Sequence, residues 1–399
     1  MTVIHDTLPP PSTRLGPAAW ARRNLFATWY DAVLTIVVGV LLAWVTVRIA
    51  AWATTDARWG VITSNLRLFL VGQYPFDQAW RIWLSLVLVG LLLGVSAGRH
   101  GGAVRTLGSA LVAFVLLLAG LAAVSGMGPG VVVALLAVAV IAIAAFAAGP
   151  RLPVGNRVLG WAWLASAPIV LVLLYGLPGL PLPIVGTNFW GGLMLTFLIA
   201  TFGIVLSFPF GVVLALGRRS SLPAIRLLST AYIELIRGVP LITVIFMADL
   251  LLPLFLPGDV RIDRLARAIG GITLFSAAYV AENVRGGLQA IPSGQIEAAH
   301  ALGLGSIQTT RLIVLPQALR AVIPANVGLF ISLLKDTTLV VIVGLLELLG
   351  IGRAVLAQPD WFGAQLEVYV FVAAVFFVLC AALSSASYRL EASLGVGTR

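Results

Sequence analysis

The stretch IPSGQIEAAHALGLGSIQTTRLIVLP, residues 291–316, is a polar interruption within an otherwise apolar sequence. Pro292 stops the segment before it, and Ser293 is a residue type that commonly caps a helix N-terminus. Gly303 follows a run of helix-forming residues, as glycine often does where a helix ends. A second helix can then run as far as Pro316, which bounds it. The stretch therefore predicts two short helices with a sharp break between them.

The first of these helices carries a carboxylate followed by two alanines, Glu297, Ala298 and Ala299. The carboxylate lies early in the helix, where the positive end of the helix dipole stabilises it. The two small side chains leave a flat patch that another protein can approach closely. On these residues alone, a capped helix pair in an ordinary loop and a docking surface are equally good interpretations.

The composition places this stretch in a membrane protein. Of the 399 residues, 60% are hydrophobic and 10% are charged, whereas soluble domains contain about 25% charged residues. The formal net charge is +10, and Lys335 is the only lysine. Because the arginines are scattered through short loops, they indicate a positive-inside orientation and no nucleic-acid partner.

Ten apolar segments are long enough to cross a hydrocarbon core of roughly 30 Å as helices. They are residues 32–53, 82–98, 104–125, 130–148, 158–176, 189–216, 229–255, 267–290, 322–349 and 366–388. Continuous apolar runs of this kind exclude membrane strands, which alternate. More arginines fall inside when residues 1–31 are placed in the cytoplasm, so both termini are predicted to be cytoplasmic. The same alternation places residues 291–316 in the cytoplasm.

The turn-rich stretch GLPGLPLPIVGTNF, residues 176–189, predicts a division of the chain. Five predicted spans precede it and five follow it. The expected organisation has four parts: a cytoplasmic N-terminal segment at 1–31, a transmembrane extension at 32–185, a core at 186–390 and a cytoplasmic tail at 391–399. Within the extension, Gly90, Gly94 and Gly98 recur every four residues, a spacing that lets a neighbouring helix approach closely.

Charged residues inside predicted spans are costly and therefore informative. Glu234 and Arg237 lie three residues apart, so they can pair on one helix face. Glu282 and Arg285 repeat that spacing in the next span. Such charges either fix the helix bundle through ion pairs between helices or line a path for a charged solute.

Lys335 and Asp336 lie about 17 Å beyond Pro324 at 1.5 Å per residue, close to the bilayer midplane. If they line a solute path, Glu282 or Asp336 would face the ammonium group of a zwitterionic solute such as an amino acid. Lys335 would then face its carboxylate. These residues are hypotheses for a substrate pathway, together with the two spaced pairs.

Catalytic and nucleotide-binding motifs are not evident. No Cys, His and carboxylate cluster has the spacing of a metal site. A P-loop requires a lysine followed by Ser or Thr, and the sole lysine, Lys335, is followed by Asp336. If this chain takes part in ATP-driven transport, the ATPase is expected to be a separate polypeptide. The chain itself is predicted not to be an enzyme.

The pattern Glu-Ala-Ala at 297–299, Gly303 and Ile-x-Leu-Pro at 313–316 resembles the cytoplasmic coupling loop of ATP-binding-cassette (ABC) importer permeases. Three further segments are similar to those of permeases for polar amino acids. They are ELIRGVPL at 234–241, YVAENVRGG at 279–287 and KDTTL at 335–339. The resemblance covers residues of roughly 186 to 390. The long N-terminal extension resembles the larger permeases of bacterial general L-amino-acid systems.

This resemblance implies an all-α polytopic fold, with a five-helix core of the type I ABC importer permeases and about five extra N-terminal transmembrane helices. It implies a multi-pass protein of the bacterial inner membrane that imports polar L-amino acids. The implied partners are two copies of an ABC ATPase, a second homologous permease, a periplasmic amino-acid-binding protein and membrane lipids. ATP and Mg would be bound by the ATPase, so this chain is expected to hold no cofactor.

The coupling loop implied by the resemblance consists of residues that would contact the ATPase or shape that contact. They are Glu297, Ala298, Ala299, Gly303, Ile313, Leu315 and Pro316. An ion-coupled secondary transporter that acts without an ATPase is the alternative. The two hypotheses differ in whether uptake follows ATP hydrolysis by a partner or an ion gradient.

Overall fold

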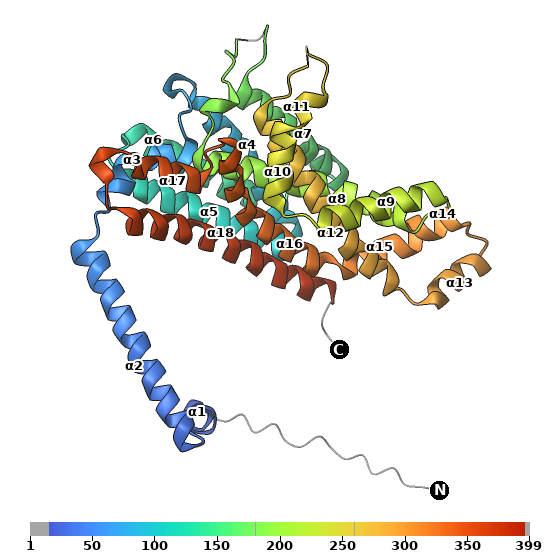
Figure 1. Cartoon of the computed structure of the whole chain (residues 1–399), viewed down its shortest axis with the longest axis horizontal. Helices are drawn as coiled ribbons and strands as arrows, with labels where there is room; N and C mark the ends of the chain where they lie inside the picture. The colour runs from blue at the N-terminus through green and yellow to red at the C-terminus, as the bar shows by residue number, and fades with distance from the viewer. Residues whose placement is uncertain (1–15, 180, 259, 396–399) are drawn as a thin grey trace. The chain divides into compact units, whose positions relative to one another are not determined.

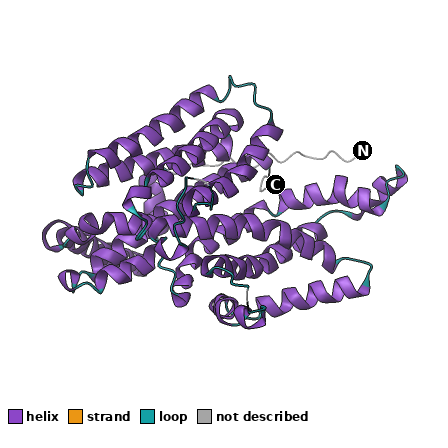
Figure 2. Ribbon diagram, turned by 90° about the horizontal axis from the view of Figure 1, so that it is seen from above, coloured by secondary structure: helices purple, strands orange, loops and turns teal. Residues whose placement is uncertain are grey.

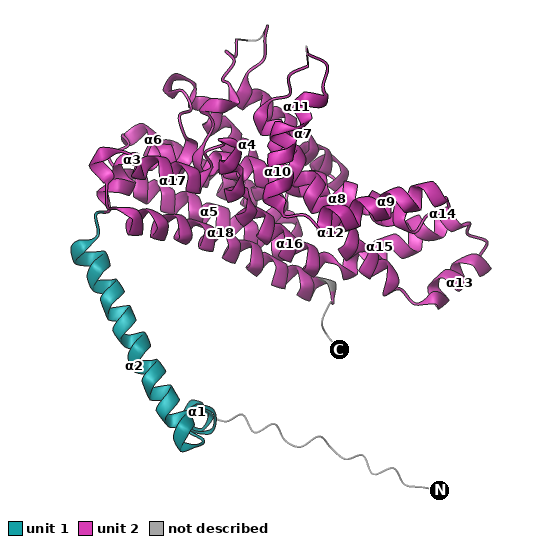
Figure 3. Ribbon diagram, viewed as in Figure 1, with its two compact units in different colours: residues 1–58 teal, residues 59–399 magenta. Residues whose placement is uncertain are grey.

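The computed structural model describes residues 16–179, 181–258 and 260–395. Helices make up most of these residues (Figures 1 and 2). The chain divides into two compact units, Met1–Arg58 and Trp59–Arg399 (Figure 3). Residues 1–15 of the predicted N-terminal segment and residues 396–399 of the predicted tail lie outside the described residues.

Unit 1 contains α1 (Pro17–Leu25), α2 (Trp29–Ala51) and a π-helical turn, η1 (Trp52–Asp56). Thr28 caps α2, because its hydroxyl accepts the Asp31 N–H at 3.3 Å while the Asp31 carboxylate accepts the Thr28 N–H at 3.2 Å. This reciprocal pair is a capping box. The predicted first span, 32–53, is confirmed as a helix that begins three residues earlier.

The first half of unit 2 comprises a short helix and four long ones. They are α3 (Gly60–Val71), α4 (Trp80–His100), α5 (Gly102–Val124), α6 (Pro129–Ala148) and α7 (Asn156–Tyr175), with η2 (Phe76–Gln78) between α3 and α4. The glycine spacing on α4 brings it against α6. A Cβ at Gly94 would lie 2.4 Å from the Ala142 carbonyl oxygen, and one at Gly98 would lie 2.3 Å from the Phe146 carbonyl oxygen. The close approach expected from the spacing is confirmed.

The second half of unit 2 contains the remaining long helices and the predicted loop. Its elements outside that loop are η3 (Thr187–Phe189), α8 (Gly192–Arg218), α9 (Pro223–Arg237), α10 (Leu241–Leu250), α11 (Leu252–Phe255), α12 (Arg264–Gln289), α16 (Ile323–Asp336), η5 (Thr337–Val343), α17 (Leu348–Leu356), η6 (Pro359–Trp361) and α18 (Gln365–Leu394). Both sides of the expected division near 185 pack into this one unit. Phe69 of α3, for example, shares an apolar cluster with Leu193 of α8 and Leu348 of α17.

Eight helices among the described residues are long and apolar enough to cross a membrane, or nine if one bent pair counts as a span. The bent pair corrects the predicted continuous span 229–255, because α9 and α10 meet at 108°. The break falls at residues 238–240. Pro240 has no N–H to donate and disfavours a helical conformation at Val239, so the helix cannot continue through it.

The predicted span 267–290 is helical but is not among those eight. It corresponds to α12, whose 26 residues extend about 39 Å at 1.5 Å per residue. Its polar side chains, such as Thr273 and Ser276, are buried against neighbouring helices. A helix that is covered by protein needs less apolar surface than one that faces lipid. The predicted span 322–349 ends earlier than expected, at Val343, where Gly344 turns the chain with a φ of +74°.

Candidate functional site

The polar stretch 291–316 forms two helical segments with a break, as predicted. The first is α13 (Ser293–Ala301). The second is one helical path built from α14 (Ser306–Thr309), the π-helical turn η4 (Thr310–Val314) and α15 (Leu315–Ala321). Figure 1 shows α13 and α14 at one end of unit 2. We call residues 291–321 the loop module, and we call the end where α8 and α12 finish at Arg218 and Gln289 the loop end.

Gly303 makes the reversal between the two segments. Its φ is +81°, in the left-handed region that L-residues with a side chain enter at a cost of roughly 1–2 kcal/mol. The Gly303 N–H donates to the His300 carbonyl at 2.9 Å, and the Leu304 N–H donates to the Ala299 carbonyl at 3.1 Å. These two bonds are a Schellman motif, which satisfies the last carbonyls of α13. No atom lies within 4 Å of a Cβ built at Gly303, so only the backbone conformation demands glycine there.

Two details of the predicted boundaries are wrong. Pro292, not Ser293, occupies the N-cap position of α13, and no side chain caps that helix. Pro316 does not bound the second helix either, because the helical path runs from Ser306 to Ala321. The Leu315 N–H reaches back to the Thr310 carbonyl across the π-turn. This wider turn rearranges the carbonyl groups of the turn that precedes Pro316. Since Pro316 has no N–H to donate, the rearranged turn lets the helix continue past it.

The predicted coupling residues differ in how far their side chains are exposed to solvent. Glu297, Ala298 and Pro316 are exposed, and Ile313 and Leu315 are half-buried. Ala299 is buried, so only one of the two alanines contributes to the expected flat patch.

Two large apolar side chains beside the break were missed from the sequence. Leu302 is 83% exposed and Ile307 is 84% exposed. Apolar surface is therefore left uncovered on both sides of the turn. The position of these two side chains on either side of Gly303, inside a polar loop, was the available signal.

The second helical path anchors the loop module to the rest of unit 2. Val314 and Ala318 pack in one apolar cluster with Ile233 of α9 and with Val284 and Leu288 of α12. All five side chains are less than 5% exposed. A displacement of the loop module is therefore transmitted directly to α9 and α12, because a close-packed interior does not absorb it.

A charge network next to this cluster joins three helices. The Glu282 carboxylate on α12 accepts from Arg285 Nε at 3.0 Å and from Arg218 Nη1 at 3.3 Å, and it lies 3.6 Å from Arg237 Nη1. Arg218, the last residue of α8, also reaches Glu234 on α9 at 2.9 Å. We call these five residues the Glu282 network. It ties α8, α9 and α12 together at the loop end.

The network tests the charge pairs expected from spacing. The contact between Glu282 and Arg285 is confirmed. The contact expected between Glu234 and Arg237 is wrong, because Glu234 binds Arg218 while Arg237 lies beside Glu282 and over the Tyr279 ring, 5.7 Å from its centroid. Arg218 was missed because its position at the end of one span says nothing of which carboxylates it meets.

Lys335 and Asp336 lie apart from the Glu282 network. They end α16, about 18–20 Å along that helix from its first residue, Ile323, at the loop end. Lys335 is exposed and Asp336 is half-buried. The six residues of the predicted substrate pathway therefore fall into two separate groups.

A second set of charges lies at the opposite end of unit 2, where α8 and α12 begin. Arg267 Nη2 is 2.8 Å from the Asp249 carboxylate, and Arg264 Nε is 3.9 Å from it. Arg264 and Arg267 also line a pocket of about 370 Å³ together with Trp190. Asp249 was missed from the sequence, although a single acid in the apolar run 241–256 is the signal that an intramembrane charge provides.

The exposed helix pair packs through its second segment against α9 and α12, and the Glu282 network joins those two helices to the membrane-length helix α8. The chain is a polytopic helical membrane protein that carries an exposed helix pair at one end of unit 2. The family described as "Binding-protein-dependent transport system inner membrane component" matches residues 207–393. The chain belongs to this family, and it matches two relatives over almost their whole length.

One of these relatives is the inner membrane amino-acid ABC transporter permease protein YhdY of Escherichia coli K12, 37% identical, with 95% of this chain and 93% of the relative covered. The other is the glutamate/glutamine/aspartate/asparagine transport system permease protein BztC of Rhodobacter capsulatus, 39% identical, with 97% and 95% covered. A shorter relative, the probable glutamine ABC transporter permease protein GlnP of Bacillus subtilis, is 37% identical over 51% of this chain and 91% of its own length.

Among solved structures, an amino acid ABC transporter with histidines matches at a TM-score of 0.46 and 30% identity, over 51% of this chain and 92% of that chain. The two long relatives show that a chain of this length, N-terminal helices included, recurs in the family. The predicted family is confirmed by the two long relatives, and the predicted all-α polytopic fold is confirmed by the helices of the described residues.

Proposed function

We propose that the chain is the membrane-spanning permease subunit of an ABC importer for polar L-amino acids in a bacterial inner membrane. Family membership supports the role of a transport component, and the names of the two long relatives support the solute class. The observation that carries the proposal is the loop module, because a secondary transporter that acts alone has no use for an exposed, rigidly anchored helix pair.

The ATPase contacts exposed residues of the loop module, among them Glu297, Ala298, Leu302 and Ile307. Two ATPase copies bind ATP and Mg, and their closure pushes on α13. The cluster around Val314 and the Glu282 network pass that push to α8, α9 and α12. These helices then move as a unit, since their loop ends are held to one another.

A second homologous permease completes the path, and a periplasmic amino-acid-binding protein delivers the solute at the end where α8 and α12 begin. In this arrangement the loop end is cytoplasmic and the chain itself catalyses no reaction. The Glu282 network holds helices together. Away from that network, Asp336 is the candidate contact for the ammonium group of the solute, and Lys335 is the candidate contact for its carboxylate.

The test is reconstitution of the purified complex in proteoliposomes with a binding protein, followed by measurement of radiolabelled glutamate, glutamine and aspartate uptake. We expect uptake that requires ATP on the loop side and that fails when the ATPase is omitted. Uptake by the chain without an ATPase, driven by an ion gradient, would instead establish the secondary transporter.

A further inference from the structure

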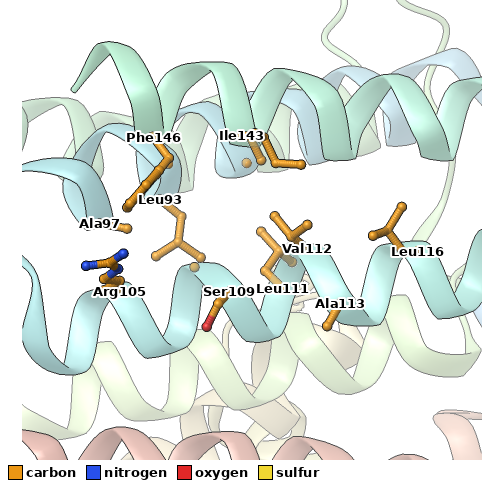
Figure 4. A pocket seen from close by; sticks show the side chains of 14 residues that line it. Leu93, Ala97, Arg105, Ser109, Leu111, Val112, Ala113, Leu116, Ile143 and Phe146 are labelled. Carbon is orange, nitrogen blue, oxygen red and sulfur yellow. The ribbon is translucent and has the colours of Figure 1, made fainter.

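An apolar groove lies between α4, α5 and α6, and no residue of the loop module or of the Glu282 network lines it. Its volume is about 370 Å³. All of its lining residues except Arg105 and Ser109 are apolar or glycine. Figure 4 shows the side chains of Leu93, Val112, Leu116, Ile143 and Phe146 around it. Because all three helices are membrane-length, the groove lies among segments that face the bilayer.

The dimensions of the groove fit a single extended hydrocarbon chain. Its lining residues on α5 run from Arg105 to Leu116, which is about 17 Å at 1.5 Å per residue. Over that length an α-helix of about 10 Å diameter fills roughly 1,300 Å³, well above the volume of the groove. A helix from another subunit therefore does not fit within the groove, whereas an acyl chain does.

One end of the groove is strongly basic. The exposed Arg105 guanidinium lies over the Phe146 ring, 5.3 Å from its centroid. Arg99, at the end of α4, donates to the Leu152 carbonyl at 2.7 Å, which brings Arg151 to the same end. The sequence from Arg99 to Arg157 contains no Asp or Glu, so its own segment supplies no carboxylate for these cations.

This basic end lies at the loop end of unit 2. Tyr175, at the end of α7, and Gly191, just before α8, both line the pocket that contains Arg264 and Arg267. That pocket lies at the end of unit 2 opposite the loop end. The start of α7 and the end of α8 therefore lie at the loop end. Arg99 binds the carbonyl of Leu152, only four residues before α7 begins at Asn156, so the basic residues lie at that end too.

We propose that this groove binds one acyl chain of an anionic phospholipid, whose phosphate group is held by Arg105 with Arg99 and Arg151 nearby. The apolar walls exclude a polar ligand, and the volume excludes a helix. These arginines attract a negatively charged headgroup, since each basic residue near an anionic membrane surface contributes about 1 kcal/mol. Phosphatidylglycerol serves as the probe for this class of lipid.

The experiment is native mass spectrometry of the purified full-length complex, titrated with phosphatidylglycerol or phosphatidylethanolamine of identical acyl chains. Arg105→Gln removes the headgroup contact, and Arg226→Gln, at an exposed arginine of α9, is its matched control. Val112→Trp fills the groove. Val133→Trp, on an exposed surface of α6 outside the groove, controls for the added indole.

We expect one phosphatidylglycerol molecule to bind in preference to phosphatidylethanolamine. Arg105→Gln should weaken phosphatidylglycerol binding about fivefold and Arg105→Lys should largely restore it. Val112→Trp should abolish retention of both lipids, while both controls leave binding unchanged. Equal retention of the two lipids, equal effects of Arg105→Gln and Arg226→Gln, or undiminished binding to Val112→Trp would each overturn the proposal. Cross-linking of a protein segment into the groove of the native complex would do the same.

Discussion

The reversal at Gly303 offers the sharpest test of how the loop module works. With a φ of +81° and no atom within 4 Å of a built Cβ, Gly303 differs from other residues only in backbone freedom. Gly303→Ala should cost roughly 1–2 kcal/mol in the native loop conformation, which lowers the population of the reversed loop relative to competing conformations about 5- to 30-fold. Asn tolerates the left-handed region, so Gly303→Asn should cost less, and the β-branched Gly303→Val should cost more.

Gly305 provides the matched control. It lies two residues further along the same loop but has an ordinary φ of −69°, which alanine adopts without strain. The nearest atom to a Cβ built there is Gln308 Oε1, at 3.9 Å. Gly305→Ala should therefore behave as the unaltered protein does. The pair of alanine variants separates the effect of backbone conformation from that of an added methyl group.

The assay compares ATP hydrolysis with amino-acid uptake in proteoliposomes that contain the complete complex. We expect each variant to accumulate in the membrane, because the loop module lies outside the apolar core of the long helices. Molecules of uptake per ATP hydrolysed should fall in the order glycine, Asn, Ala, Val. If Gly303→Ala and Gly305→Ala couple equally well, or if Asn is as damaging as Val, the reversal does not limit coupling.

Three further perturbations separate the roles assigned to other residues. Glu282→Gln should lower the free energy of unfolding of the purified complex by about 2 kcal/mol, which is measured as a lower Tm. Three arginines share this carboxylate, and hydrogen bonds to charged groups contribute roughly 1.5–3 kcal/mol. Leu302→Ser and Ile307→Ser, at side chains more than 80% exposed, should leave Tm unchanged but each weaken ATPase association up to about tenfold, measured by co-purification. Asp336→Asn should raise the KM for amino-acid uptake while the ATPase remains bound.

The first two of these perturbations have matched controls. Glu297→Gln removes a carboxylate that is exposed, so Tm should not change. Leu254→Ser removes an apolar side chain that is 76% exposed and remote from the loop module, so ATPase association should persist. Full stability of Glu282→Gln, full association of both serine variants, or an unaltered KM for Asp336→Asn would contradict the respective assignment.

The helices were largely predictable because their signal is local. A run of apolar residues long enough to cross a bilayer has few folded states besides a helix, since every backbone N–H needs a partner in lipid. The bend between α9 and α10 was missed although Pro240 was visible, because the apolar run continues on both sides of it. The short helix α3, of 12 residues, escaped because it is too short to span a membrane by itself.

The site was predictable to a lesser extent, and its residues show why. The positions of Glu297 and Gly303 and the pairing of Glu282 with Arg285 all depend on residues within a few positions of one another. The exposure of Leu302, in contrast, depends on what the rest of the chain leaves uncovered. The meeting of Arg218 with Glu282 depends on how α8 packs against α12.

The amino-acid sequence by itself determined that this protein lies in a membrane, that most of it is helical, and that its loop reverses at Gly303. Each of these follows from composition or from hydrogen bonds between near neighbours in the chain. Only the tertiary structure decided which of Ala298 and Ala299 faces outward, which arginines surround Glu282, and that a basic-ended groove opens between α4, α5 and α6. Those features arise between residues far apart in sequence, where the packing of whole helices sets every distance.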